Sequence, residues 1–352
     1  MSMNKLPIKT KLGFGICDLG GNLFFTVMAI LLLNYLTDTV LISAGLAGLI
    51  IMVGKVWDAV TDPLVGFLSD RTQSRMGRRR PYLLFGSVPL FIMMIIMFTN
   101  PGFEGEGKLF AWGVVVFCLL CFAYTIVNIP YSAMTPELTK DFHERSSLNG
   151  YRFGFAVIGT LLGAGAALPI VNMFPDKNMG YSVMGGLFGF VMMVTAIITV
   201  ILVKEPEVEK REFSSGFFST YLKVFKNRPF VLILVAYAIN VTGITIVAGV
   251  VIYYFKYLHQ NEEATTIAML ILFVTAMFFI PVSVILAKKI GKKAVYSIGL
   301  LIMSVSVMIL FFTGHVFGMT YSLATFVLSG VGMGFTYAMP YAIIPDTIEH
   351  GY

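Results

Sequence analysis

The feature that most constrains this chain is a series of ten long apolar stretches. A helix that crosses a bilayer needs about 20 such residues. The stretches cover residues 12–36, 43–68, 81–99, 109–134, 148–173, 180–203, 230–257, 265–287, 294–313 and 319–344. Soluble domains carry about a quarter charged residues, whereas here the charged fraction is 12% and the mean hydropathy is +0.83. Because so much apolar surface cannot be hidden from water, the sequence predicts an integral membrane protein in contact with the lipid bilayer.

The form of these stretches favours helices over strands. A transmembrane barrel alternates polar and apolar residues over strands of about ten residues, whereas these runs are longer and uninterrupted. The first run is also too long for the apolar core of a signal peptide, and it contains Asp18. We therefore predict an all-α polytopic membrane protein without a cleavable signal peptide.

The basic residues are distributed unevenly between the two sides of the predicted membrane. If the N-terminus is cytoplasmic, 20 Lys and Arg residues fall on that side and three on the other. The positive-inside rule therefore predicts a cytoplasmic N-terminus, in a multi-pass protein of the cell's inner membrane. The net charge of +6 is then a topology signal, and no nucleic-acid partner is expected.

The longest polar stretch, residues 204–229, divides six predicted spans from four. It predicts a cytoplasmic linker between an N-terminal six-helix bundle, 1–203, and a C-terminal bundle, 230–352. A weak repeat supports two related halves, because RMGRRRPYLLFG and KKIGKKAVYSIG superpose at Gly77 and Gly291. Since many transporters are built from repeated halves, we expect the second bundle, with four spans, to be incomplete and to lack two C-terminal helices of twelve.

The second apolar stretch contains GKVWDAVTDP, residues 54–63, whose polar side chains would lie inside the membrane. At 3.6 residues per turn, one helix face carries Lys55, Asp58, Thr61 and Asp62. Intramembrane charges usually face a cavity and carry function. Two carboxylates at this spacing repel each other, and a bound Na⁺ or H⁺ relieves that repulsion. Thr61 would add an oxygen ligand, and Lys55 would balance charge in the empty site. Alternatively, Lys55 and one aspartate form a structural pair.

Two further charges lie deep in other spans, Asp18 in the first and Arg152 in the fifth. If they face one cavity, each can bind two adjacent hydroxyl groups of a polyhydroxyl ligand. Alternatively, they pair with each other. In the fourth span, Tyr124, Thr125 and Asn128 share a face near Pro130. Tyr124 could stack on a sugar and Thr125 or Asn128 could contact the cation, or the group is a polar kink without function.

The loop GFLSDRTQSRMGRRRP predicts a cytoplasmic gate rather than a plain stop of basic residues. In this hypothesis Asp70 receives an arginine from a neighbouring helix end in one conformation and releases it in another. The residues assigned to the gating loop are Gly66, Asp70, Arg71, Gly77 and Arg78. The charged segment TPELTKDFHERSSL, which follows the fourth span, is suited to the same role.

Four motifs in order carry a resemblance that runs from residue 10 to the end of the chain. They are CDLGGN, GKVWDAVTDPLVGFLSDRTQSRMGRRRP, NIPYSAMTPELTKDFHERSSLNGYR and PDTIEHGY. This combination resembles the glycoside–pentoside–hexuronide:cation symporters, the melibiose permease-like family of the major facilitator superfamily. The resemblance implies the major facilitator fold, with six and four of its usual twelve helices visible here.

The resemblance also implies roles for individual residues. Cation binding falls on Asp58, Thr61, Asp62 and Thr125, and sugar binding on Asp18, Tyr124, Asn128 and Arg152. The chain departs from the family pattern where Cys17 replaces a lysine, Thr61 an asparagine, Asn128 an aspartate and Ser132 a tryptophan. These departures argue against a galactoside, and the loss of an aspartate at Asn128 slightly favours a substrate with its own carboxylate.

The predicted function is symport of a glycoside, pentoside or hexuronide with Na⁺, H⁺ or Li⁺, by alternating access. We expect a monomer that needs no cofactor and no metal beyond the coupling ion. The alternative is a transport-inactive membrane sensor or scaffold derived from such a symporter. An enzyme is not expected, because His143 and His350 stand alone and no nucleophile–base pair is visible.

Overall fold

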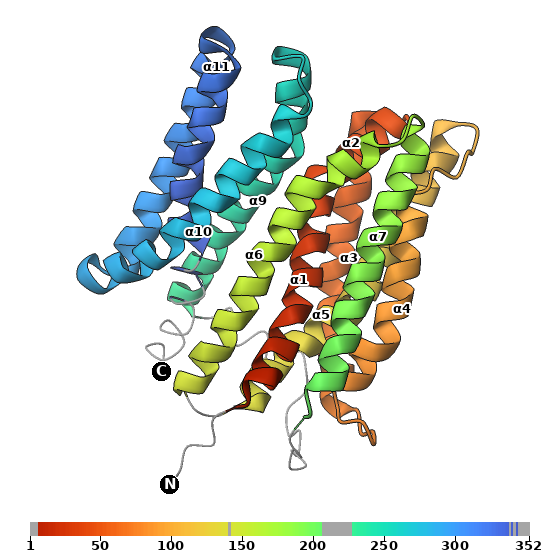
Figure 1. Ribbon diagram of the computed structural model, residues 1–352, viewed down its shortest axis with the longest axis vertical. Coiled ribbons are helices and arrows are strands. Elements are labelled where there is room, and N and C mark those ends of the chain that lie inside the picture. The colour runs from red at the N-terminus through yellow and green to blue at the C-terminus, as the bar shows by residue number, and fades with distance from the viewer. Residues whose placement is uncertain (1–5, 140–141, 206–226, 338, 341–342, 344–352) are drawn as a thin grey trace. The chain divides into compact units, whose positions relative to one another are not determined.

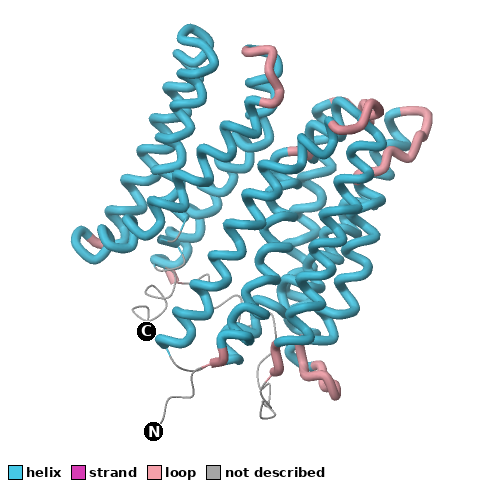
Figure 2. The backbone as a smooth tube through the Cα atoms, viewed as in Figure 1, coloured by secondary structure: helices cyan, strands magenta, loops and turns pink. Residues whose placement is uncertain are grey.

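The computed structural model describes the chain except residues 1–5, 140–141, 206–226, 338, 341–342 and 344–352. Most of the predicted linker, 204–229, therefore lies outside the described residues. The chain divides into two compact units, Met1–Val208 and Glu209–Tyr352. Every regular element among the described residues is a helix (Figure 2), and nine of these helices are long and apolar enough to span a membrane. The predicted all-α membrane fold is confirmed.

The first unit contains one long helix for each of its six predicted spans (Figure 1). They are α1 (Ile8–Ile30), α3 (Ala44–Arg71), α4 (Arg80–Met97), α5 (Glu106–Leu138), α6 (Phe142–Asn172) and α7 (Lys177–Leu202). Between α1 and α3, the chain forms the short α2 (Leu32–Asn34) and a π-helix, η1 (Tyr35–Thr39). Lipid offers no hydrogen-bond partners to the backbone, and a helix supplies these partners within the segment. Long apolar runs therefore become helices.

Packing in the first unit centres on α1. Helix α1 packs against α6 and α7, α4 packs against α5 and α7, and α3 packs against α5. Small residues allow the closest of these approaches: a Cβ atom at Gly159 of α6 would overlap the backbone of Leu19 in α1. Such small-residue contacts are how membrane helices pack without a hydrophobic driving force between them. They hold α1 and α6 close enough for polar side chains to bridge them.

The second unit contains α9 (Arg228–Leu258), α10 (Ala264–Ile290) and α11 (Lys292–Tyr337). Helix α11 has 46 residues and breaks at Gly318, where φ is 84°. Its two arms form an antiparallel hairpin, because the Ser306 Oγ donates to the Thr325 carbonyl at 2.9 Å and hydrogen bonds with the Ser329 Oγ at 2.6 Å. The two arms of the hairpin correspond to the predicted spans 294–313 and 319–344. The second arm is helical as far as Tyr337, where α11 ends.

Candidate functional site

An ion pair joins α1 and α6 inside the first unit. The Arg152 Nε lies 2.5 Å from Asp18 Oδ2, and the Arg152 Nη2 lies 3.3 Å from Asp18 Oδ1. The structure therefore brings together two residues that are 134 positions apart in the sequence, in the mutual pair that was the predicted alternative to binding a ligand. The Asp18 side chain is 14% exposed and the Arg152 side chain 21%, so the pair is partly accessible. A ligand with hydroxyl groups could reach both charges.

Helix α5 completes this charged group. The Tyr131 hydroxyl donates to Asp18 Oδ2 at 2.6 Å and lies 3.0 Å from the Phe14 carbonyl oxygen. The Arg152 Nη1 donates to the Thr135 Oγ1 at 2.8 Å, and the guanidinium carbon lies 4.9 Å from the centre of the Tyr131 ring. Neither Tyr131 nor Thr135 was predicted as a site residue. The signal for Tyr131 was its position three residues after Asn128, on the same helix face.

Tyr124 and Asn128 lie nearby on α5, beside a small pocket that Cys17 and Gly21 of α1 also line. The Tyr124 ring stacks on Phe24 with centroids 4.2 Å apart and meets the edge of Phe25 at 5.2 Å. In this structure Tyr124 is therefore buried, with Phe24 in the stacking position that the sequence analysis assigned to a sugar. The roles of Tyr124 and Asn128 in binding stay predictions.

The polar residues of α3 have separate partners. Asp62 Oδ1 accepts a hydrogen bond from the Thr125 Oγ1 of α5 at 2.7 Å, and Asp58 Oδ2 pairs with the Lys55 Nζ at 3.3 Å. Thr61 is buried and donates to the Trp57 carbonyl of its own helix at 3.0 Å. Asp58 Oδ1 is buried without a hydrogen-bond partner among the described residues. A carboxylate oxygen with free lone pairs fits a cation ligand.

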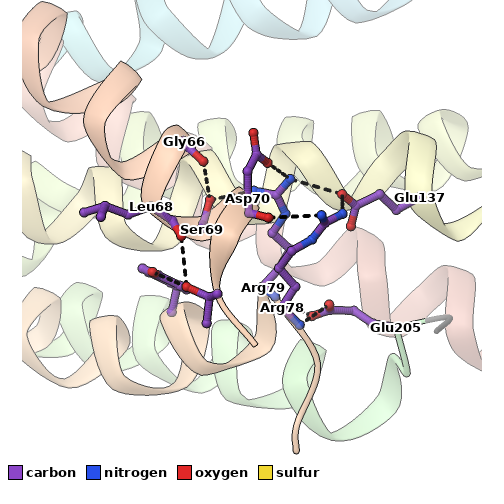
Figure 3. A network of polar contacts seen from close by, with 10 residues as sticks. Gly66, Leu68, Ser69, Asp70, Arg78, Arg79, Glu137 and Glu205 are labelled. Carbon is purple, nitrogen blue, oxygen red and sulfur yellow. Dashed lines mark hydrogen bonds and ion pairs between the residues drawn. The ribbon is translucent and has the colours of Figure 1, made fainter. Parts of the chain in front are cut away.

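The predicted gating loop contains a second charged network, at the end of α3 and the start of α4 (Figure 3). The Arg79 guanidinium pairs with the Asp70 carboxylate. It also lies 3.1 Å from the Glu137 Oε1 and donates to the Ser69 Oγ at 2.5 Å. Arg78 donates to the same Glu137 oxygen at 2.7 Å and to the Asp70 carbonyl at 3.1 Å. The network thus ties the α3–α4 loop to the end of α5.

Glu205, just after α7, binds the same loop from another direction (Figure 3). Its carboxylate accepts the backbone N–H groups of Arg78, Arg79 and Arg80 at 2.6, 2.8 and 2.6 Å. N–H groups at the start of a helix such as α4 have no carbonyl partner within the helix. The helix dipole also favours an anion at this end. The preceding Gly77 has φ of 104°, a conformation that favours glycine.

The structure thus joins Asp70 and Arg78 of the predicted gating loop, but Arg79 is the arginine that pairs with Asp70 through its side chain. Gly66 contributes its carbonyl, which accepts from the Ser69 Oγ at 3.0 Å. Arg71 lies with its guanidinium 3.6 Å from the centre of the Phe67 ring. Glu137 belongs to the second segment proposed for gating, and Glu205 was missed. Whether this network opens and closes stays a prediction.

The fold and its intramembrane polar groups define a multi-pass membrane protein of the transporter class. The chain belongs to the MFS/sugar transport protein family, whose model matches residues 13–352. This match confirms the resemblance to the major facilitator superfamily and supports a transporter rather than an enzyme.

This chain matches different shares of the lengths of its curated relatives. An uncharacterized symporter of Synechocystis sp. is 27% identical, over 99% of this chain and 80% of the relative. A putative glycoside/cation symporter of Escherichia coli is 34% identical, over 75% of this chain and 58% of the relative. A putative sulfoquinovose importer of E. coli is 27% identical, over 99% and 74%.

Solved structures support the fold. The D-xylose–proton symporter has a TM-score of 0.68 at 15% identity, over 94% of this chain and 80% of that chain. The xylose transporter XylE of E. coli, in a partially occluded inward-open conformation, has a TM-score of 0.70 at 16% identity, over 97% and 85%. At these identities the likeness concerns the fold alone.

Proposed function

We propose that this protein is a secondary transporter that carries a glycoside, pentoside or hexuronide together with Na⁺, H⁺ or Li⁺ by alternating access. The observation that carries the proposal is the position of α5 between two charged groups. Thr125 of α5 contacts Asp62, and Tyr131 of the same helix contacts Asp18 in the Asp18–Arg152 pair. A change at either group is therefore transmitted directly to the helix that forms part of the other.

The cation would bind between α3 and α5. Lys55 offsets one of the two aspartate charges, and the remaining negative charge attracts a cation. The Thr125 hydroxyl now donates to Asp62, and it would rotate to turn an oxygen lone pair toward Na⁺, whereas a proton on Asp62 would let the same contact persist. Ligand charge and oxygen number fit Na⁺ or Li⁺, and carboxylates in low dielectric also take up protons.

The sugar would bind at the Asp18–Arg152 pair. Carboxylate and guanidinium groups each hold two adjacent hydroxyls, so a sugar can replace the bonds that the two residues now make to each other. The relatives named as a glycoside/cation symporter and as a sulfoquinovose importer support a sugar or sugar acid. The absence of a carboxylate at Asn128 favours the acid. Coupling of this kind is reciprocal, so sugar and cation tighten each other's binding by the same factor.

The basic residues support an inner-membrane protein with a cytoplasmic N-terminus, and we propose that it acts as a monomer. The test is uptake of labelled glycosides and uronides into vesicles, with and without a Na⁺ or H⁺ gradient. It compares this chain with Asp58→Cys, Asp62→Asn and the exposed control Glu104→Gln. Gradient-driven uptake that both aspartate variants lose and the control keeps supports symport and locates the cation. If the folded protein moves no sugar under any gradient, the symport proposal fails and a transport-inactive sensor replaces it.

A second comparison tests the coupling through α5. Thr125→Ala removes the hydroxyl that contacts Asp62, while Thr125→Ser keeps it. We expect the alanine variant to bind sugar with little or no enhancement by the cation, and the serine variant to keep the enhancement. Equal enhancement in both variants would exclude Thr125 as the link between the two sites.

A further inference from the structure

The connection between α10 and α11 concentrates four lysines in six residues. Helix α10 ends with Lys288, Lys289 and Ile290, and α11 begins with Lys292 and Lys293. Gly291 alone connects the two helices, with φ of 88° and ψ of 149°. The tight turn therefore holds all four lysines at one end of the helix pair. We call residues 288–293 the lysine turn.

The lysine turn is directed outward from its unit. Lys288, Lys289 and Lys293 are exposed, and Ile290 among them is 47% exposed. An apolar side chain flanked by long cationic ones suits the boundary between acyl chains and headgroups, because lysine can extend its ammonium group toward the polar side while its carbon chain stays in the apolar region. Position alone thus places this turn where phospholipid headgroups lie.

Three of these lysines, Lys288, Lys289 and Lys293, have no acidic partner among the described residues. The first turn of α11 contains no acidic residue, although a helix N-terminus favours negative charge and disfavours lysine. The related α3–α4 loop differs, because Asp70, Glu137 and Glu205 bind its arginines and its backbone N–H groups.

We propose that the lysine turn is a binding surface for the phosphate groups of anionic phospholipids. Clusters of four or more basic residues next to the cytoplasmic end of a membrane helix attract anionic lipids. Lysine is a compact, strongly hydrated point charge and binds phosphate groups in that form. Ile290 adds an apolar anchor. The surface requires only that the chain lies in a membrane and does not depend on symport.

The test is titration of the purified full chain, freed of lipid in neutral detergent, with phosphatidylglycerol and with phosphatidylcholine. Native mass spectrometry reports the dissociation constants of the lipid adducts. Four proteins are compared: the unaltered chain, Lys288→Gln/Lys289→Gln, the charge-keeping Lys288→Arg/Lys289→Arg, and the control Lys108→Gln/Lys177→Gln. The control removes the same charge from the side of the membrane that the sequence analysis assigns to the exterior.

We expect the unaltered chain to prefer phosphatidylglycerol, and the glutamine pair to weaken that binding about tenfold or more. The arginine pair and the control should bind as the unaltered chain does, and phosphatidylcholine binding should not change. Equal phosphatidylglycerol affinity in the unaltered chain and the glutamine pair would overturn the proposal, and so would an equal loss in the control. If the glutamine pair does not fold, a phosphatidylglycerol affinity of the unaltered chain that is independent of salt between 50 and 500 mM NaCl would overturn it as well.

Discussion

The α3–α4 loop and the lysine turn start from similar sequences and differ in how their charges are satisfied. Each has a glycine with positive φ, Gly77 or Gly291, followed directly by basic residues and a membrane helix. In the first unit Asp70 at the end of α3 and Glu137 of α5 meet the Arg78 and Arg79 side chains, and Glu205 accepts the backbone N–H groups (Figure 3). In the second unit three of the four lysines are exposed. Similar local sequences thus coexist with two different electrostatic environments.

The chemistry of the two side chains accounts for this difference. The planar Arg79 guanidinium, only 4% exposed, contacts Ser69, Asp70 and Glu137 at the same time. An ammonium group lacks this fixed fork and is more strongly hydrated, so lysine would bury poorly in that place. Arginine is therefore the residue for a closed, buried network, and lysine for an open surface.

Removing the carboxylate that both arginines share should have the largest effect. Glu137→Gln keeps the size of the side chain but leaves Arg78 and Arg79 without their common anion. Breaking a buried pair costs about 3–5 kcal/mol, and we expect about 3 kcal/mol here because the Glu137 side chain is 16% exposed. Unfolding in detergent by increasing SDS measures it. The exposed control Glu104→Gln should change stability by less than about 0.5 kcal/mol, and similar losses in the two variants would contradict the closed network.

Removing the anion at the start of α4 should cost somewhat less. In Glu205→Gln, an amide replaces a carboxylate that accepts three backbone N–H groups. Hydrogen bonds to charged groups contribute about 1.5–3 kcal/mol, and we expect a loss of about 2 kcal/mol. Hydrogen exchange of the amides of Arg78, Arg79 and Arg80 should also become faster. Unchanged exchange at these three amides would show that Glu205 does not hold them.

The two glycines should respond differently to alanine. Both substitutions strain the backbone by about 1–3 kcal/mol, but a Cβ at Gly77 would also lie 2.8 Å from the Glu205 carboxyl carbon. No atom lies within 4 Å of a Cβ at Gly291. We therefore expect Gly77→Ala to destabilise more than Gly291→Ala, by about 1 kcal/mol. In the background of Glu205→Gln this difference should become smaller, and a difference that persists in full would place its cause elsewhere.

The smallest effect should come from the lysine turn itself. Lys289→Gln removes an exposed charge without an ion-pair partner among the described residues, so stability in neutral detergent should change by less than about 0.5 kcal/mol. In phosphatidylglycerol nanodiscs the same variant should lose more stability than in phosphatidylcholine nanodiscs. A loss near that of Glu137→Gln in neutral detergent would show that Lys289 belongs to a buried network.

The elements of the fold could be read from the sequence with good accuracy. Each of the six predicted spans of the first unit is a helix, because lipid leaves a long apolar segment no other way to satisfy its backbone. Helix α11 differs from the other predicted spans, because it joins two of them at Gly318 without a loop between them. The sequence separates these spans by residues 314–318 only, and the side-chain contacts of Ser306 with Thr325 and Ser329 show that the two arms fold back as a hairpin.

The candidate sites were predictable in part. Intramembrane charges are rare and costly, so Asp18, Asp58, Asp62 and Arg152 could be found from the sequence. Two of their pairings, Asp18 with Arg152 and Lys55 with an aspartate, were among the alternatives that the sequence offered. The contact of Tyr131 was not: its helix face, shared with Asn128, marks it as a candidate, but no local pattern shows that its hydroxyl meets Asp18.

Local composition and the solvent properties of lipid are enough to predict that this protein lies in a membrane as helices and which residues bear charge there. Which of those charges find partners depends on how the helices pack. Glu137 and Glu205 bind Arg78 although they are 59 and 127 residues away in the sequence. No local sequence pattern predicts contacts over such separations. Helix packing brings these groups together, and the cost of leaving a buried charge unpaired holds them there.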